Sequence, residues 1–328
     1  MTDSEQPARR RWRRVRAIAV VTAVAAAAVA LLVRTPAPIG HWDDAAGHDR
    51  FRAAYDTAFA ALPTPARTLD IRTDHGVVRV YRFTGARPAA RPFVLLPGRA
   101  SATPVWADNL PGLLELGDVY TVDLLGEPGM SIQERPITGD ADHAAWLHQT
   151  LAALPEEAVH VVGLSIGGWT AVNLALHDPT HVATLTLIDP VHVFDDLPLG
   201  TIVRSLPAAL PWLPKSWRDG FNSYTAGGAP VEDEPTAAMI EAGMRHYRLE
   251  LPAPTRIGED RLAGLRPPVL AIIAGRSVMH DPATAVATAR RALPGAAVRC
   301  YPDASHAING ERPAEIAADI AEFTGAHP

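Results

Sequence analysis

At 328 residues, with 48% hydrophobic and 20% charged residues, the chain has an ordinary globular composition and room for one large α/β domain with attachments. The single cysteine, Cys300, excludes an intramolecular disulfide framework. The formal net charge of −6 divides into +5 over residues 1–34 and −11 over the remainder, and this acidic body excludes a basic footprint for nucleic acid.

The N-terminal segment has the pattern of a membrane signal. Residues 1–16 contain six arginines, and an uncharged run, Ala17–Val33, made mostly of Ala, Val and Leu, follows them. At ~1.5 Å per residue the run is about 25 Å long, close to the ~30 Å hydrocarbon core of a bilayer. The basic flank is expected to stay in the cytoplasm and the C-terminal body outside. We therefore predict an uncleaved signal-anchor. The alternative is a cleaved signal peptide, of the twin-arginine kind, and a secreted protein.

The segment after the apolar run predicts the entry to a folded domain. Residues 34–42 form a proline-rich linker, and the domain is expected to span residues 43–328. Aromatic residues four apart predict a helix over Asp43–Leu62. Two β-rich runs joined by a turn, Thr68–Arg72 and Gly76–Phe83, predict an antiparallel pair of strands.

From residue 91 onward, apolar strand-like runs alternate with helical segments. Continuous apolar strands separated by helices indicate a mostly parallel sheet covered on both faces, the α/β class. The predicted strands are Pro92–Leu96, Val119–Leu124, Val159–Gly163, Val182–Ile188, Val269–Ala274 and Ala297–Tyr301. The predicted helices are Val105–Leu116, Ala141–Leu154, Trp169–Leu176, Ala283–Leu293 and Ala314–Phe323.

One long stretch interrupts this alternation. Nearly eighty residues between Asp189 and Pro268 contain no clear strand but several Leu-Pro pairs and a helical pattern over Pro235–Tyr247. A loop of that length must carry its own structure. We expect a helical cap at about residues 190–267, inserted between the sixth and seventh predicted strands.

The sequence Gly163-Leu164-Ser165-Ile166-Gly167 joins a predicted strand to a predicted helix. A serine at such a junction lies on a very tight turn, and a Cβ at either glycine would collide with the neighbouring strand or helix. The turn presents the hydroxyl above the sheet edge and directs the free N–H groups of the helix start toward whatever the serine attacks. Ser165 is therefore the predicted nucleophile.

A serine nucleophile needs a base, and the base needs an orienting partner. His306 lies 141 residues after Ser165, just past the last predicted strand, where a loop can fold back over the serine. We predict that His306 is the base, although histidine is common elsewhere in the chain.

Four motifs together resemble the α/β-hydrolase superfamily, in its esterase/lipase-like branch with a helical cap. They are Leu95–Gly98, Asp123–Ser131, Gly163–Trp169 and Ser305–Ala307. The resemblance covers roughly residues 68–328 and implies the α/β-hydrolase fold. It also implies an oxyanion hole formed by the backbone N–H groups of Ile166 and Arg99. The usual His-Gly before the oxyanion residue is replaced by Pro97-Gly98, so a side chain that commonly braces this loop is absent.

The position of the triad acid departs from the family pattern. The expected place, three residues after Gly275, holds Val278, which cannot orient an imidazole. Two carboxylates are alternatives: Asp189, at the end of the preceding strand, and Asp281. Both precede a proline, the arrangement of a helix N-cap. A dyad oriented by water, or without an acid, is the third alternative.

These features predict a serine hydrolase that cleaves a carboxylic ester, or a related acyl bond, of a small and mostly apolar substrate through an acyl-enzyme. The sequence contains no H-E-x-x-H, Walker or dinucleotide fingerprint, so we expect neither a cofactor nor a metal. One alternative is C–C hydrolysis, perhydrolysis or acyl transfer on the same scaffold. The other is a catalytically inactive binding protein at the cell envelope, which only the vacant acid position at Val278 supports.

Overall fold

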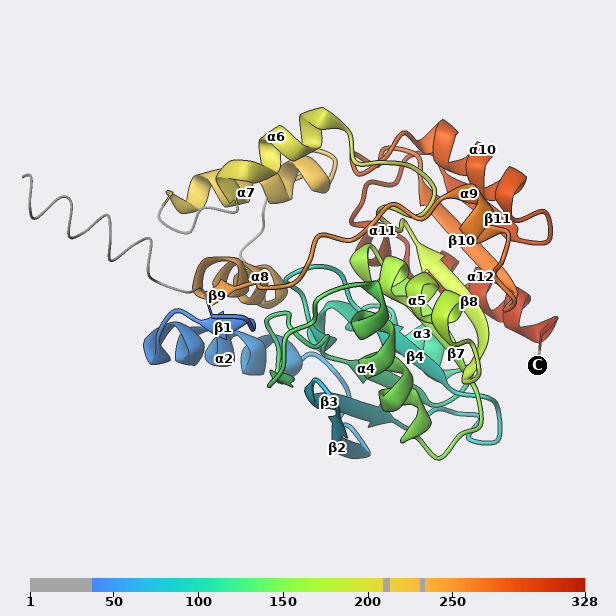
Figure 1. The fold of residues 1–328 in the computed structure, drawn as a ribbon, viewed down its shortest axis with the longest axis horizontal. Helices are drawn as coiled ribbons and strands as arrows, with labels where there is room; N and C mark the ends of the chain where they lie inside the picture. Colours follow the sequence, from blue (N-terminus) through green and yellow to red (C-terminus); the bar gives the residue numbers. More distant parts are fainter. Residues whose placement is uncertain (1–36, 209–212, 231–233, 328) are drawn as a thin grey trace, which may run out of the picture. The chain divides into compact units, whose positions relative to one another are not determined.

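The computed structural model describes residues 37–208, 213–230 and 234–327, and its centre is a twisted, mostly parallel β-sheet (Figure 1). Its strands run in the order β11-β10-β8-β7-β4-β5-β3-β2, with the short β6 beside β3. The strands are β2 (Arg67–Thr73), β3 (Gly76–Phe83), β4 (Phe93–Leu96), β5 (Val119–Val122), β6 (Ile132–Gln133), β7 (Val159–Leu164), β8 (Val182–Ile188), β10 (Val269–Ala274) and β11 (Ala297–Tyr301).

Strands β4, β5, β7, β8, β10 and β11 pair in parallel, whereas β3 pairs antiparallel with β5, β2 and β6. Because the carboxyl ends of parallel strands meet at one edge of the sheet, the residues that follow β7, β8 and β10 lie side by side. The predicted α/β class, with a mostly parallel sheet, is confirmed.

Helices cover both faces of the sheet because the central strands are apolar on both sides. In β4, Val94 and Leu96 belong to one buried cluster, while Phe93 and Leu95 belong to the other. The first cluster packs under α4 (Asp140–Ala152), α5 (Ile166–His177) and α10 (Pro282–Ala292). The second packs under α2 (Ala45–Phe59), α3 (Leu110–Leu114) and α12 (Pro313–Gly325), and α11 (Ile308–Glu311) precedes α12.

The segment between β8 and β10 is helical and lies beside the carboxyl edge of the sheet (Figure 1). It contains α6 (Leu199–Ala208), α7 (Lys215–Thr225), α8 (Pro235–His246), β9 (Tyr247–Arg248) and α9 (Glu259–Leu262). A buried ion pair, Arg218 with Glu241 at 2.8 Å, joins α7 to α8. The strand β1 (His41–Trp42) pairs antiparallel with β9, and α2 packs against α8, so the start of the described chain is tied to this segment.

The prediction of a single helix over Val105–Leu116 is wrong. The structure has a 3₁₀ helix at Thr103–Trp106, η1, and then the short helix α3. A proline stands in the first turn of each, at positions 104 and 111. Proline is tolerated in a first helical turn but clashes with the preceding turn, so the second proline restarts the helix. The two-residue strands β1, β6 and β9 are too short for a periodic signal, and β1 lies within the predicted linker.

The predicted membrane segment, Ala17–Val33, and the basic residues 1–16 before it lie outside the described residues. Across the described ranges, none of the helices combines the length and hydropathy that a bilayer-spanning segment needs.

Candidate active site

Ser165 lies on the tight turn that the sequence predicts. It follows β7 directly, precedes α5, and has φ +54° and ψ −116°, a conformation that L-residues rarely adopt. A Cβ on Gly163 would lie 2.4 Å from the carbonyl oxygen of Gly167, and one on Gly167 would lie 2.2 Å from that of Leu96. No larger residue fits at either position, so the two glycines allow strand, turn and helix to approach this closely.

The structure brings Ser165, His306 and Asp189 into one chain of hydrogen bonds. The Oγ atom of Ser165 lies 2.9 Å from Nε2 of His306, and Nδ1 of the same ring lies 2.6 Å from Oδ2 of Asp189. A carboxylate only accepts, so Nδ1 carries the proton toward Asp189 and Nε2 is left to accept the proton of the serine hydroxyl. This is the arrangement in which an imidazole acts as a general base toward a serine.

Asp189 is completely buried at the end of β8, with φ +43°. Its carboxylate accepts four hydrogen bonds. Three come from the side chains of His306, Ser277 and His280, and the fourth from the backbone N–H of Ala274. Burial alone would raise the pKa of Asp189, but the hydrogen bonds from the two histidines outweigh burial and hold that pKa well below its ordinary value. The acid therefore stays ionised beside His306.

The second candidate acid, Asp281, lies elsewhere. It is the N-cap of α10, and its Oδ1 accepts from the backbone N–H of Thr284 at 2.7 Å. The vacant acid position, Val278, contributes only its backbone carbonyl, which accepts from the hydroxyl of Thr201. Of the two carboxylates that the sequence offered, Asp189 is the one that contacts His306.

The residues predicted to form the oxyanion hole have free backbone donors. Ile166 is the first residue of α5, and Arg99 follows β4. Within the described part of the chain, neither of their N–H groups has a hydrogen-bond partner. The loop after β4 runs close to the serine, because a Cβ on Gly98 would lie 3.6 Å from the Cβ of Ser165. Two unpaired donors therefore lie on segments that flank the Ser165 hydroxyl.

Comparison with known proteins agrees with this architecture. Residues 93–319 match the sequence profile described as "Alpha/beta hydrolase family". The chain belongs to the alpha/beta hydrolase family. Two curated relatives come from Bacillus subtilis (strain 168). "Uncharacterized carboxylesterase nap" is 24% identical over 84% of this chain and 93% of that protein. "Carboxylesterase YbfK" is 23% identical over 84% of this chain and 93% of that one.

Two solved structures from Bacillus subtilis have the same fold. The crystal structure of carboxylesterase CesB (YbfK) has a TM-score of 0.79 at 21% identity, over 86% of this chain and 99% of that one. The structure of naproxen esterase (carboxylesterase NP) has a TM-score of 0.78 at 23% identity, over 85% of this chain and 98% of that one.

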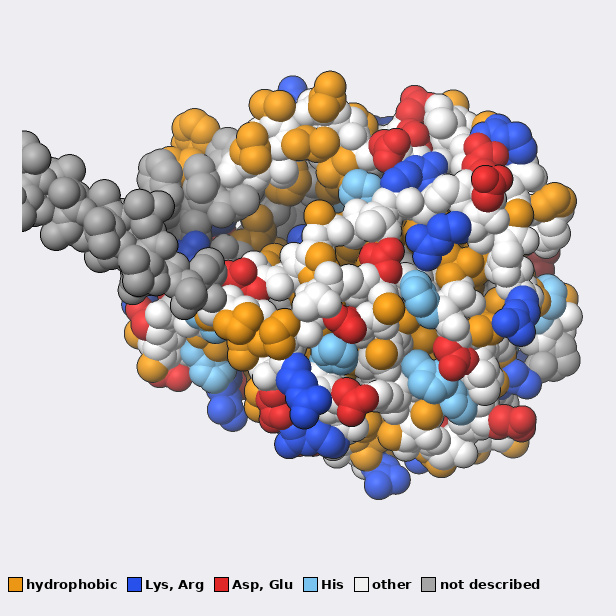
Figure 2. Space-filling model, viewed as in Figure 1, with side chains coloured by type: hydrophobic (Ala, Val, Ile, Leu, Met, Phe, Trp, Pro, Cys, Tyr) orange, Lys and Arg blue, Asp and Glu red, His pale blue; other side chains and the backbone are white. Residues whose placement is uncertain are grey.

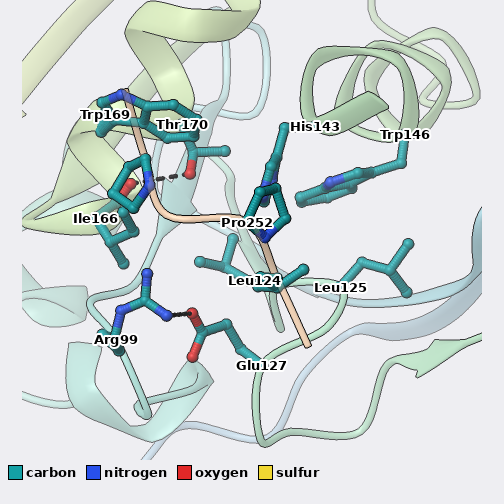
Figure 3. A pocket seen from close by; sticks show the side chains of 12 residues that line it. Arg99, Leu124, Leu125, Glu127, His143, Trp146, Ile166, Trp169, Thr170 and Pro252 are labelled. Carbon is teal, nitrogen blue, oxygen red and sulfur yellow. Dashed lines mark hydrogen bonds and ion pairs between the residues drawn. The ribbon is translucent and has the colours of Figure 1, made fainter. Parts of the chain in front are cut away.

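In this hydrolase a glutamate, which the sequence analysis did not single out, braces the loop of the predicted oxyanion residue Arg99. Glu127 is buried, and its Oε2 accepts from the backbone N–H of Ala100 at 3.1 Å. Its Oε1 pairs with the Arg99 guanidinium at 3.0 Å (Figure 3). Ala100 has φ +52°, so the loop is held in a strained conformation. The only sequence signal was a charged residue inside the Gly126–Pro128 turn after a buried strand.

A narrow pocket adjoins Arg99 and Ile166, the two predicted oxyanion residues. Besides Arg99 and Ile166, its lining is mostly apolar and aromatic (Figure 3). It includes Leu124, Leu125, Trp146, Trp169, Leu251, Pro252 and Pro254. Burial lowers the pKa of His143, which also lines the pocket, to about 4, so that imidazole is neutral at pH 7. The space-filling view shows a wider hollow between α6–α7 and the sheet domain (Figure 2). In the ranges that the structure describes, no cluster of three or more His, Cys, Asp or Glu side chains could hold a metal ion.

Proposed function

We propose that this alpha/beta hydrolase cleaves carboxylic esters through an acyl-enzyme on Ser165. The observation that carries the proposal is the chain of hydrogen bonds from Ser165 through His306 to Asp189, at 2.9 and 2.6 Å, on a strained turn between strand and helix. The carboxylesterase names of its relatives support ester substrates.

Each step follows from the geometry. His306 takes the hydroxyl proton as the Oγ of Ser165 attacks the ester carbonyl, and the developing oxyanion accepts from the N–H groups of Ile166 and Arg99. His306 then gives its proton to the departing alcohol, which leaves the acyl group on Ser165. A water molecule then attacks the acyl group in the same way, with His306 as the base, and the carboxylic acid is released. One ester and one water therefore give one acid and one alcohol. Asp189 stabilises the imidazolium formed in both halves.

The surroundings favour a small and mostly apolar substrate. The pocket beside Arg99 and Ile166 is lined largely by leucine, proline and tryptophan side chains, which exclude water and favour apolar groups. Short-chain p-nitrophenyl esters are therefore suitable first substrates for the full-length protein.

The decisive experiment compares Ser165→Ala with the wild type in hydrolysis of p-nitrophenyl butyrate. Loss of the nucleophile is expected to lower kcat on the order of 10⁵-fold. A fluorophosphonate probe is expected to label the wild type but not the variant. Ser205→Ala, on α6, is the matched control, because its hydroxyl bonds the carbonyl of Ile202 in its own helix. Unchanged turnover in Ser165→Ala would refute the assignment.

The alternative of an inactive binding protein loses its support. It rested on the vacant acid position at Val278, and Asp189 supplies a carboxylate to His306 from another strand. Wild-type protein that neither hydrolyses esters nor reacts with the fluorophosphonate would restore this alternative.

We also propose that residues 17–33 anchor the enzyme in a membrane, with the catalytic body outside the cytoplasm. The helix α6 supports this location, because it exposes Leu199, Val203 and Leu206 by 80%, 63% and 59%. Membrane fractionation of the full chain and of a variant lacking residues 1–33 tests the anchor. N-terminal sequencing of the mature protein distinguishes it from a cleaved signal peptide and a secreted enzyme.

A further inference from the structure

The loop that joins β10 to α10, residues 275–281, contributes hydrogen bonds to the carboxylate of Asp189. Its histidine, His280, is buried, and Nε2 of that ring lies 2.9 Å from Oδ1 of Asp189. Its serine, Ser277, places Oγ 2.6 Å from Oδ2 of the same carboxylate. The last residue of β10, Ala274, donates its backbone N–H to Oδ1 at 2.9 Å.

The two carboxylate oxygens of Asp189 accept hydrogen bonds from different donors. Oδ1 accepts from Ala274 and His280, while Oδ2 accepts from Ser277 and His306. A carboxylate has about four lone-pair sites, so all of them are used and the group cannot rotate without breaking a buried hydrogen bond. The direction in which Oδ2 faces His306 is therefore fixed by groups outside the relay.

We propose that His280 is a positioning residue: by holding Oδ1 of Asp189 it keeps Oδ2 aimed at Nδ1 of His306. This inference rests on the proposed function, because it concerns the efficiency of the same relay. His280 touches neither Ser165 nor His306 within hydrogen-bond distance, so it acts only through Asp189.

A histidine at position 280 is unfavourable for stability if it serves only to fill the core. In the described part of the chain, the second ring nitrogen of His280, Nδ1, is buried and lacks a well-formed hydrogen bond, and the backbone of Asp281 is the polar group that interacts with this side of the ring. Leaving a buried polar atom unpaired costs roughly 1–3 kcal/mol, which an apolar residue would avoid. The protein accepts this cost together with the strained φ of +43° at Asp189. Such costs concentrate where a side chain must be held in one orientation.

The charge of His280 also interacts with Asp189, the partner of His306. The carboxylates that face its ring are Asp189, Asp195 and Asp281. Burial alone would lower the pKa of His280, but the hydrogen bond to Asp189 outweighs burial and raises that pKa above its ordinary value. A charged His280 offsets part of the negative charge of Asp189. Glutamine at position 280 could still donate to Oδ1 but would never carry this charge.

The experiment compares the full-length wild type with His280→Ala, His280→Gln and the control His160→Gln in hydrolysis of p-nitrophenyl butyrate. His160 is also buried, and Nδ1 of that ring pairs with Thr184, but it stands near the opposite end of β7 from Ser165. His280→Ala is expected to lower kcat at least 10-fold with KM within twofold. His280→Gln is expected to recover much of kcat at high pH. It should also change the pH dependence of kcat/KM, because Asp189 then faces one titratable group fewer. His160→Gln should change only stability.

The proposal is overturned if His280→Ala folds, keeps kcat within twofold of the wild type and has the same pH dependence of kcat/KM. It is also overturned if activity falls only in proportion to the folded fraction, as in a purely structural role. The downfield proton resonance of His306 Nδ1–H reports the same contact without turnover, and we expect it to shift or broaden in His280→Ala. If the wild type does not hydrolyse the ester but the resonance still differs between the wild type and His280→Ala, only the esterase assignment is refuted. If the resonance is the same in both proteins, the positioning role is refuted.

Discussion

Removing the brace on the oxyanion loop tests whether that loop is held for catalysis. Glu127→Ala deletes the hydrogen bond to the backbone N–H of Ala100 and the ion pair with Arg99. A hydrogen bond to a charged group contributes roughly 1.5–3 kcal/mol, and the strained backbone of Ala100 adds a cost of similar size once it is not held. The ion pair adds little, because the Arg99 side chain is 41% exposed.

The expected loss follows from the place of Arg99, one residue before Ala100. If the loop relaxes, the N–H donor of Arg99 moves away from the position of the oxyanion, and full loss of such a donor costs about 3 kcal/mol. Partial displacement should cost roughly 1.4–2.7 kcal/mol, which is about 10- to 100-fold in kcat. Because the oxyanion exists only in the transition state, KM should stay within about threefold.

Steady-state hydrolysis of p-nitrophenyl butyrate measures both constants. Glu127→Gln retains an acceptor oxygen for Ala100 and is expected to keep kcat within about fivefold. Glu134→Ala, which removes only an exposed ion pair with Arg72, is the surface control. If Glu127→Ala keeps kcat within twofold, the bracing role is wrong. If it raises KM at constant kcat, Glu127 contacts the substrate instead.

Two further predictions concern the candidate acids and the response to pH. Asp281→Ala should lower the free energy of unfolding by about 1 kcal/mol, the value of a helix N-cap, without changing kcat, whereas Asp189→Ala should lower kcat at least ~10³-fold. Urea unfolding and kinetics on both variants check this, and a kcat loss in Asp281→Ala would contradict it. Burial lowers the pKa of His160 to about 4, so its contribution to stability is fully present above its unfolded pKa of ~6.5 and is lost as pH falls toward 4. His160→Gln should remove roughly 2 kcal/mol of this acid destabilisation between pH 7 and pH 4.5, and a pH–stability curve as steep as that of the wild type would contradict the prediction.

The sheet and the turn at Ser165 were predictable because their signals are local. Buried parallel strands are continuous apolar runs, and β8, β10 and β11 begin and end where the sequence predicts. The two glycines around Ser165 meet backbone atoms at distances that no side chain tolerates, so their spacing between a predicted strand and a predicted helix indicates the turn.

The choice of acid was not predictable, because both candidates share one local pattern. Asp189 and Asp281 each precede a proline after an apolar segment. What separates them is tertiary: Asp189 is buried under donors from three other segments, while Asp281 caps a helix at the surface. Glu127 and His280 escaped prediction for the same reason, since their partners lie 27 and 91 residues away.

The order of the strands explains why an acid after β8 can serve the relay. The register pairs Leu164 of β7 with Ile188 of β8, and the next residues along each strand are Ser165 and Asp189. These two positions are therefore neighbours across the sheet edge, about one strand spacing of ~4.8 Å apart, and a single imidazole can bridge their side chains. The next strand, β10, lies on the far side of β8, and its loop can then support the acid from behind. His306 follows β11, the outermost strand, and reaches back over this row. Nucleophile, acid, acid support and base thus come from β7, β8, β10 and β11 in their spatial order, so a carboxylate at Val278 is not required.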